Sequence, residues 1–330
     1  METAVMWEKY LEHLRDRAIK ESVNGEDLKE LPHLPTEYLP LLVYYAGEVK
    51  RHFFPEGLEF CSIINAKSGA CSQDCKFCAQ SRFYETKAPV YTFLDGEQIL
   101  KGAEFAVKNG AKHYSLVLSG KAATDREIDR LVHLAGEIKR RFPRLELCFS
   151  AGTLKREQIE RLKKAGFRRL HHNLETSERF FPNIVTTHSW RERYQTLLWA
   201  KEVGMETCSG GLFGMGETWG DRIDLAITLR ELEVDSIPLN FLIPIKGTPL
   251  GDRPLMSPKE ALITIAIFRF ANPCSEIRLA GGRERVLGDY LGMANFMVNA
   301  HMVGGYLTRA GRDPAEDRRS IEGIGLELLT

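Results

Sequence analysis

The feature that most constrains the fold of this chain is a regular alternation of short apolar runs with longer amphipathic stretches. The runs have the composition of buried β-strands, and the segments between them carry apolar residues at helical spacing. Eight such repeats over roughly 250 residues are typical of a (βα)8 barrel, although an open doubly wound sheet also alternates. We therefore predict an α/β fold, a TIM-type barrel, with strands at Phe60–Ala66, Lys112–Leu118, Leu145–Ser150, Arg168–Asn173, Glu206–Gly211, Ser236–Ile243, Glu276–Ala280 and His301–Tyr306.

Helix boundaries are marked by residues that satisfy free backbone groups. Thr124 and Glu127 form a capping box, and Ser257 followed by Pro258 provides an N-cap and a first-turn proline. A left-handed glycine is expected where a helical run ends before a strand, and three glycines occupy such places: Gly110, Gly166 and Gly204.

The first 55 residues differ from the repeating part. Leu11, Leu14 and Ala18 recur at helical spacing, and prolines interrupt the pattern at residues 31–40. We expect an N-terminal helical cap at residues 1–55, a barrel at 56–315 and a C-terminal tail at 316–330.

Charge and hydropathy exclude several classes of partner. Lys+Arg and Asp+Glu both number 45, so no net field favours nucleic acid or an anionic membrane. No uncharged apolar stretch is long enough to span a bilayer, and the first ten residues lack the pattern of a signal peptide. We expect a cytoplasmic protein with no nucleic-acid or membrane partner.

The strongest chemical signal is a C-x3-C-x2-C run that follows the first predicted strand. Cys71, Cys75 and Cys78 place three thiols within eight residues, and thiolates are the natural ligands of iron–sulfur clusters. Three ligands leave the fourth iron of a [4Fe–4S] cluster open. S-adenosylmethionine (SAM) can chelate that iron and, after one-electron reduction, yield a 5′-deoxyadenosyl radical. A structural zinc ion would normally require a fourth protein ligand.

Several further motifs resemble the biotin synthase family, in the order found there. The family is a (βα)8 homodimer that inserts sulfur into dethiobiotin using SAM radicals, with a second iron–sulfur cluster as the sulfur donor. The resemblance implies dethiobiotin as substrate and a flavodoxin- or ferredoxin-type reductant. The motifs are Cys61–Cys71, Ala79–Ser81, His172–Ser177, Cys208–Gly211, Gly214–Thr218, Lys246–Leu250 and Ile277–Leu279.

The same resemblance assigns four polar residues to SAM and substrate. Asn173 and Glu175 match residues that reach SAM and substrate, Arg193 matches an arginine that meets the SAM carboxylate, and Asn240 matches an asparagine that binds the ureido ring. Taken alone, Asn173 and Glu175 also suit a helix cap, and Arg193 suits a surface pair with Glu192 or Glu178. His171 stands where the family usually has asparagine.

The second cluster is where this chain departs from the family. The family binds a [2Fe–2S] cluster with three cysteines and an arginine, matched here by Cys148, Cys208 and Arg278, but Ser115 replaces the remaining cysteine. Two other cysteines remain: Cys61 lies on the first predicted strand, and Cys274 lies just before the seventh.

We therefore hypothesise a four-iron auxiliary cluster on the first, third and fifth strands. Residues of alternate strands form one interior layer in such a barrel, so Cys61, Cys148 and Cys208 would share a layer if their pleats match. Cys274 or Arg278 completes the set. The alternatives are a [2Fe–2S] cluster with Ser115 or water as ligand, and cysteines that are merely buried.

Two other functions are compatible with these motifs. One is a related radical SAM maturase or methylornithine-type mutase, which needs no sacrificial cluster. The other is a non-catalytic iron–sulfur electron carrier, although electron transfer does not require a large barrel with ligand-like residues.

Overall fold

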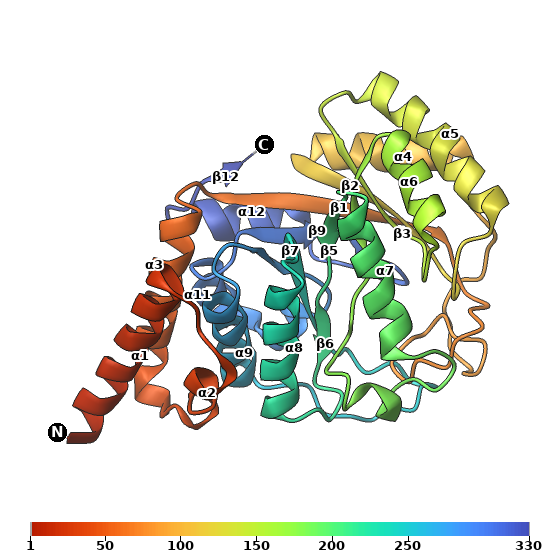
Figure 1. Ribbon diagram of the computed structural model, residues 1–330. Helices are drawn as coiled ribbons and strands as arrows, with labels where there is room; N and C mark the ends of the chain where they lie inside the picture. The colour runs from red at the N-terminus through yellow and green to blue at the C-terminus, as the bar shows by residue number, and fades with distance from the viewer. Residues whose placement is uncertain (1, 330) are drawn as a thin grey trace.

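The computed structural model describes residues 2–329, and the side chains of residues 6–329. Its strands run parallel around a barrel, and β1 pairs with both β2 and β9, which closes it (Figure 1). Closure confirms the predicted TIM-type barrel and excludes the open doubly wound sheet. The barrel strands are β1 (Leu58–Lys67), β2 (Ala111–Leu118), β3 (Glu146–Ser150), β4 (Phe167–His171), β5 (Glu206–Cys208), β6 (Gly211–Phe213), β7 (Ser236–Phe241), β8 (Glu276–Leu279) and β9 (Ala300–Val303).

The predicted fifth strand is divided into β5 and β6. Between them the chain runs against β7 so closely that a Cβ atom on Gly210 would lie 1.9 Å from the carbonyl oxygen of Pro238. Only glycine permits this approach. The predicted eighth strand is also shorter, because Gly304 turns the chain at φ 86° into a hairpin of β10 (Gly305–Tyr306) and β11 (Arg309–Ala310).

Helices cover the outside of the barrel, and their ends match the capping predictions. Thr124 accepts a hydrogen bond from the Glu127 amide, and Ser257 accepts one from the Glu260 amide. The three predicted helix-ending glycines have φ angles of 75°, 100° and 68°. The covering helices are α4 (Gly96–Lys108), α5 (Asp125–Arg141), α6 (Arg156–Lys164), α7 (Trp190–Glu202), α8 (Trp219–Glu231) and α9 (Pro258–Ala271).

The N-terminal residues form helices that pack beside α9, as Figure 1 shows in red and orange. They are α1 (Glu2–Lys20), α2 (Gly25–Leu28) and α3 (Leu39–Phe53), with short 3-10 turns at Leu31–His33 and Thr36–Tyr38. Leu11, Leu14 and Ala18 are buried, as their helical spacing predicts. Among residues 2–329, no helix combines the length and apolar composition needed to cross a bilayer.

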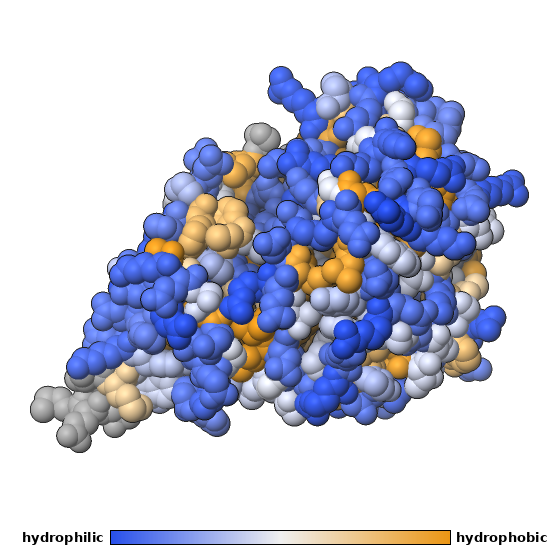
Figure 2. All heavy atoms as spheres, viewed as in Figure 1, coloured by the Kyte–Doolittle hydropathy of each residue, from blue (hydrophilic) through white to orange (hydrophobic). Residues whose placement is uncertain are grey.

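The C-terminal residues pack against the barrel. They form α10 (Arg283–Val286), α11 (Leu291–Asn295), α12 (Pro314–Glu322) and β12 (Leu328–Leu329), and β12 adds to β1 through Leu58 and Leu328. The boundaries predicted at residues 55 and 315 stay predictions. Figure 2 shows hydrophilic residues over most of the face seen in Figure 1, with apolar atoms in smaller patches.

Candidate active site

One cavity of about 390 Å³ lies inside the barrel and extends to the loops that follow the strands. Its walls include six of the seven cysteines. Three come from the loop after β1, and three come from the strands themselves: Cys71, Cys75, Cys78, Cys61, Cys148 and Cys208. The cavity therefore joins the cysteines of the loop to those of the strands.

The loop after β1 is held in shape by backbone hydrogen bonds. The Cys71 amide donates to Gln80 O at 2.9 Å, and the Cys78 amide donates to Cys75 O at 3.0 Å. Burial raises the pKa of Cys78 to about 11 and also raises that of Cys75, which its neighbour Cys78 raises further. Thiols of this kind lose their protons when they bind iron.

The spacing of the thiols suits a cluster better than a single ion. Mononuclear zinc has Zn–S distances of about 2.3 Å, so its sulfur ligands lie close together. Among the described residues, neither cysteine set brings three Sγ atoms within 4.8 Å of one another. A cubane holds its thiolates farther apart, and three soft thiolates around an open space fit a [4Fe–4S] cluster.

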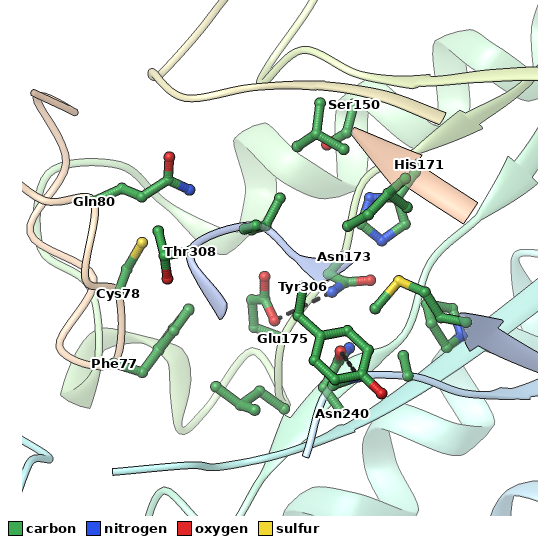
Figure 3. Close-up of a pocket in the computed structure, with 18 of the residues that line it drawn as sticks. Phe77, Cys78, Gln80, Ser150, His171, Asn173, Glu175, Asn240, Tyr306 and Thr308 are labelled. Carbon is green, nitrogen blue, oxygen red and sulfur yellow. Dashed lines mark hydrogen bonds between the residues drawn. The ribbon is translucent and has the colours of Figure 1, made fainter. Parts of the chain in front are cut away.

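The predicted SAM residues lie together beyond the end of β4. Arg193, on α7, donates from Nε to Asn173 O at 2.5 Å, and its Nη2 lies 3.3 Å from Glu175 Oε1. Asn173 Nδ2 lies 3.5 Å from Glu175 Oε2, and Figure 3 shows this pair between Cys78 on one side and His171 on the other. Because Arg193 faces the cavity, the alternative of a surface pair with Glu192 or Glu178 is wrong.

Glu175 has a backbone conformation that asparagine or glycine would adopt more readily. Its φ angle is 69°, and its amide donates to Gly210 O at 3.1 Å. Burial raises the pKa of its carboxyl group, while Arg193 and Asn173 lower it. Strained backbone of this kind is concentrated at ligand sites. No helix begins at residues 173–175, so the helix-cap alternative is wrong as well.

Asn240 and His171 line the same cavity. The Asn240 side chain accepts from the Gly281 amide at 3.0 Å and donates to Gly211 O at 3.3 Å. These bonds fix the amide but leave one N–H and one lone pair for a ligand. Burial lowers the pKa of His171 to about 4, so its imidazole is neutral at pH 7.

The three strand cysteines face inward from β1, β3 and β5. All are buried, and burial raises the pKa of Cys61 to about 11. The three thiols line the same cavity, where Cys61 and Cys208 further raise the pKa of Cys148. Ser115 pairs with Cys148 across the strands, and within residues 6–329 its buried Oγ has no hydrogen-bond partner.

Cys274 does not belong to this layer, which corrects one expectation. It is exposed, in the turn between α9 and β8, and it does not line the cavity. The turn at residues 273–274 does not bring it inward, because the chain joins the sheet only at Glu276, whose amide donates to Asp235 O at 2.9 Å. Arg278, in contrast, is buried and lines the cavity.

Charged residues lie next to the cysteines, and of these the sequence motifs indicate Arg278 but not Glu59, His113, Glu276 or Arg169. Glu59, His113 and Glu276 have ligand atoms within 4.8 Å of one another, but Arg278 already pairs with both carboxylates. Arg278 pairs with Glu276, and Arg169 Nη1 lies 3.6 Å from Glu276 Oε2. The alternation of inward side chains along β4 is the signal that would have found Arg169.

The fold and the two cysteine sets define the class of protein. Residues 66–229 match the family model "Radical SAM superfamily", and residues 238–327 match "Biotin and Thiamin Synthesis associated domain". A parallel barrel with the C-x3-C-x2-C loop at its mouth, matched by these models, is that of a radical SAM enzyme.

Curated relatives give the family. The chain is 52% identical to a biotin synthase of Aquifex aeolicus (strain VF5), over 96% of this chain and 96% of the relative. It is 50% identical to a biotin synthase of Hydrogenobaculum sp. (strain Y04AAS1), over 95% of each chain. The chain belongs to the biotin synthase family.

Solved structures support the fold alone. A crystal structure of methylornithine synthase has a TM-score of 0.80 at 20% sequence identity, and the match covers 96% of this chain and 97% of the methylornithine synthase chain. The [FeFe]-hydrogenase maturase HydG has a TM-score of 0.82 at 16% identity, over 97% of this chain and 76% of its own. The barrel is therefore shared among enzymes with different names.

Proposed function

We propose that this enzyme inserts sulfur into dethiobiotin to form biotin, and that an auxiliary iron–sulfur cluster donates the sulfur. The observation that carries the proposal is that both cysteine sets line one cavity. The same cavity is lined by Asn173, Glu175 and Asn240. A substrate bound there would therefore contact both the source of the radical and the source of the sulfur. The family membership agrees with this reaction.

In this proposal, Cys71, Cys75 and Cys78 hold the [4Fe–4S] cluster. When bound, the cluster and SAM supply the one-electron chemistry that removes hydrogen atoms from unactivated carbon. Arg193 would pair with the SAM carboxylate, because it lines the cavity and its guanidinium is fixed through Nε on Asn173 O. Glu175 would accept hydrogen bonds from the ribose hydroxyl groups.

Asn173 and Asn240 would orient dethiobiotin. A ureido ring offers N–H donors and a carbonyl acceptor, which the fixed amide of Asn240 complements. The barrel walls would exclude water and stray hydrogen donors from the reacting carbon.

We further propose that the auxiliary cluster contains four irons and is bound by Cys61, Cys148 and Cys208. Cys61 on β1 would supply the thiolate that Ser115 lacks, and Arg278 lies nearby as a donor or unusual ligand. The orphaned Oγ of Ser115 favours a polar ligand in this space. The competing assignment is a [2Fe–2S] cluster with Ser115 or water as ligand.

A radical SAM reaction needs an external electron and, in this family, two copies of the chain. We infer a flavodoxin- or ferredoxin-type reductant and a homodimer, from the family resemblance.

The direct test uses anaerobically reconstituted protein with SAM, dethiobiotin and reduced flavodoxin. We expect biotin, 5′-deoxyadenosine and loss of sulfide from the auxiliary cluster. Turnover of another small molecule without sulfide loss would indicate a mutase or maturase. Absence of SAM cleavage would indicate an electron carrier.

The cluster type is tested by iron analysis and Mössbauer spectroscopy of the same protein. Two cubane clusters give about eight irons per chain, whereas one cubane and one [2Fe–2S] cluster give about six. About six irons with a [2Fe–2S] signal would overturn the four-iron assignment.

A further inference from the structure

Arg169 is a buried arginine that neither the motifs nor the proposed ligand set explains. It lies on β4, where it pairs with Cys148 across the strands, and only 7% of it is exposed. It lines the cavity together with the three strand cysteines and Arg278. A buried cation in such a place requires a compensating anion.

Two carboxylates hold the Arg169 guanidinium but leave part of it free. Its Nε and Nη2 lie 3.2 Å and 3.1 Å from Glu206 Oε2, and its Nη1 lies 3.6 Å from Glu276 Oε2. Nη1 has no hydrogen-bond partner in the part of the chain that the structure describes. Because buried donors are nearly always paired in native proteins, Nη1 is available to an acceptor in the cavity.

The charge of Arg169 lies beside the cysteines. Arg169 pairs with Cys148 across β3 and β4, and it lines one cavity with Cys61, Cys148, Cys208 and Arg278. A nearby cation favours the negatively charged form of a group beside it, so both arginines favour negative charge on the sulfur atoms in this cavity.

We propose that Arg169 is a positioning residue for the auxiliary cluster, directing its free N–H group and positive charge at the anionic cluster or its thiolates. The inference rests on the proposed function, because it requires a cluster at Cys61, Cys148 and Cys208. Glu206 and Glu276 set the guanidinium in place, so the cation is oriented before the cluster is assembled. A charge-assisted hydrogen bond from arginine to sulfide would stabilise the cluster and ease its reduction.

Arg168 provides a matched control, because it is the adjacent arginine and contacts the same acidic group. It is exposed and donates from Nε to Glu206 Oε1 at 2.6 Å and from Nη1 to Glu146 Oε1 at 2.8 Å. Arg168→Gln therefore removes a charge and a bond to Glu206 without altering the cavity wall.

The experiment compares wild type, Arg169→Gln, Arg169→Lys and Arg168→Gln, all reconstituted anaerobically. The readouts are the rate at which a chelator removes auxiliary iron, followed by Mössbauer spectroscopy, and the reduction potential of the auxiliary cluster. For Arg169→Gln we expect iron loss about tenfold faster, the order expected for one charged hydrogen bond, and a more negative potential. Arg169→Lys keeps the positive charge, so the reduction potential of the auxiliary cluster should stay nearer to the wild-type value than in Arg169→Gln. Arg168→Gln should match wild type.

A double variant distinguishes a merely structural role of Arg169 from the proposed role in positioning the auxiliary cluster. If Arg169 only neutralises Glu206, then Arg169→Gln with Glu206→Gln should restore wild-type iron loss and potential, and the proposal is wrong. Wild-type values in Arg169→Gln alone would also overturn it. If Arg169→Gln does not fold, as judged by circular dichroism, Arg169→Lys decides the matter: wild-type iron loss in that variant refutes a directed guanidinium. A wild-type protein with only four irons would instead refute the proposed auxiliary cluster itself.

Discussion

Cysteines in this chain have three different environments, although they are one residue type. Three lie in a loop whose backbone is fixed by its own hydrogen bonds, three lie in the interior of the barrel, and Cys274 is exposed. Burial raises the pKa of the inner thiols, so they are protonated without metal and must release protons to bind it. The protonation state of each cysteine, and its ability to bind metal, therefore depend on its position in the fold and on its neighbours.

Cys61 and Cys274 form a matched pair for a test of the inner layer. Cys61→Ser should lower the iron content from about eight to about four per chain, because one thiolate of the proposed auxiliary cluster is lost. Cys274→Ser should keep the full content, since Cys274 is exposed and away from the cavity. Iron and sulfide analysis of both variants checks this. A Cys61→Ser protein with an intact auxiliary cluster would contradict the assignment.

Substitution of Asn240 tests the substrate side of the cavity. Asn240→Ala should weaken the stimulation of SAM cleavage by dethiobiotin by about 1–3 kcal/mol, the usual cost of an unpaired buried polar group. The measurement is 5′-deoxyadenosine formation against dethiobiotin concentration. Because Asn240 also bonds to Gly281 and Gly211, the unfolding midpoint of the variant is the control. An unchanged dependence on dethiobiotin would remove Asn240 from the substrate site.

At the scale of elements, the cysteine loop depends on a second loop that is far away in the sequence. The Asp74 carboxylate accepts hydrogen bonds from the amides of Thr186 and Thr187, at 2.9 Å and 3.1 Å, and from both hydroxyl groups. The Lys76 amide also donates to Ile184 O at 3.0 Å. The segment before α7 therefore fixes the loop that presents Cys75.

The pKa of Asp74 makes this contact dependent on pH. Burial alone would raise this pKa, but hydrogen bonds from Thr186 and Thr187 outweigh it and lower the pKa to about 2. A depressed pKa contributes stability above the unfolded value of about 3.9, and this contribution is lost as the pH falls toward 2.

We therefore expect Asp74→Asn to be less stable than wild type near neutral pH, with the difference shrinking below about pH 4. Urea unfolding of the metal-free proteins at a series of pH values measures this difference in the free energy of unfolding. A difference that stays constant down to pH 2 would show that the charge of Asp74 does not hold the loop.

At the scale of the whole molecule, the C-terminal segment completes the barrel. Arg283 and Asp317 are both fully buried and paired, and Arg283 also donates to Met302 O at 2.6 Å and to the Tyr306 hydroxyl group. This pair ties α12 to the hairpin whose Tyr306 lines the cavity. Residues beyond 300 therefore contribute to both stability and the cavity wall.

Removing one member of this pair should destabilise the whole protein. Asp317→Ala leaves the buried Arg283 without its carboxylate, so we expect a loss of about 3–5 kcal/mol in the free energy of unfolding. Glu316→Gln breaks a neighbouring pair with Arg312 that is partly exposed, and it should cost at most about 1 kcal/mol. Urea denaturation of both variants measures these losses in the free energy of unfolding. Equal losses would mean that the buried pair stabilises the protein no more than the exposed pair does.

The secondary-structure elements and the cluster loop of this protein follow from local signals in its sequence. The alternation of apolar runs and helices predicted the barrel, and Thr124, Ser257 and the helix-ending glycines marked helix ends, because these signals act over a few residues. The three cysteines of the loop needed no tertiary information, since their spacing alone provides three thiolates.

Which side chains share the cavity depends, in contrast, on contacts between distant parts of the folded chain. The strand register shifts at Phe60/Cys61 and at Leu147/Cys148, so the face to which each cysteine points could not be read from the sequence. A shift of one residue reverses the direction of a strand side chain, and register is set by contacts between strands distant in sequence. For the same reason, Arg169 beside Cys148 and the exposure of Cys274 became visible only in the folded chain.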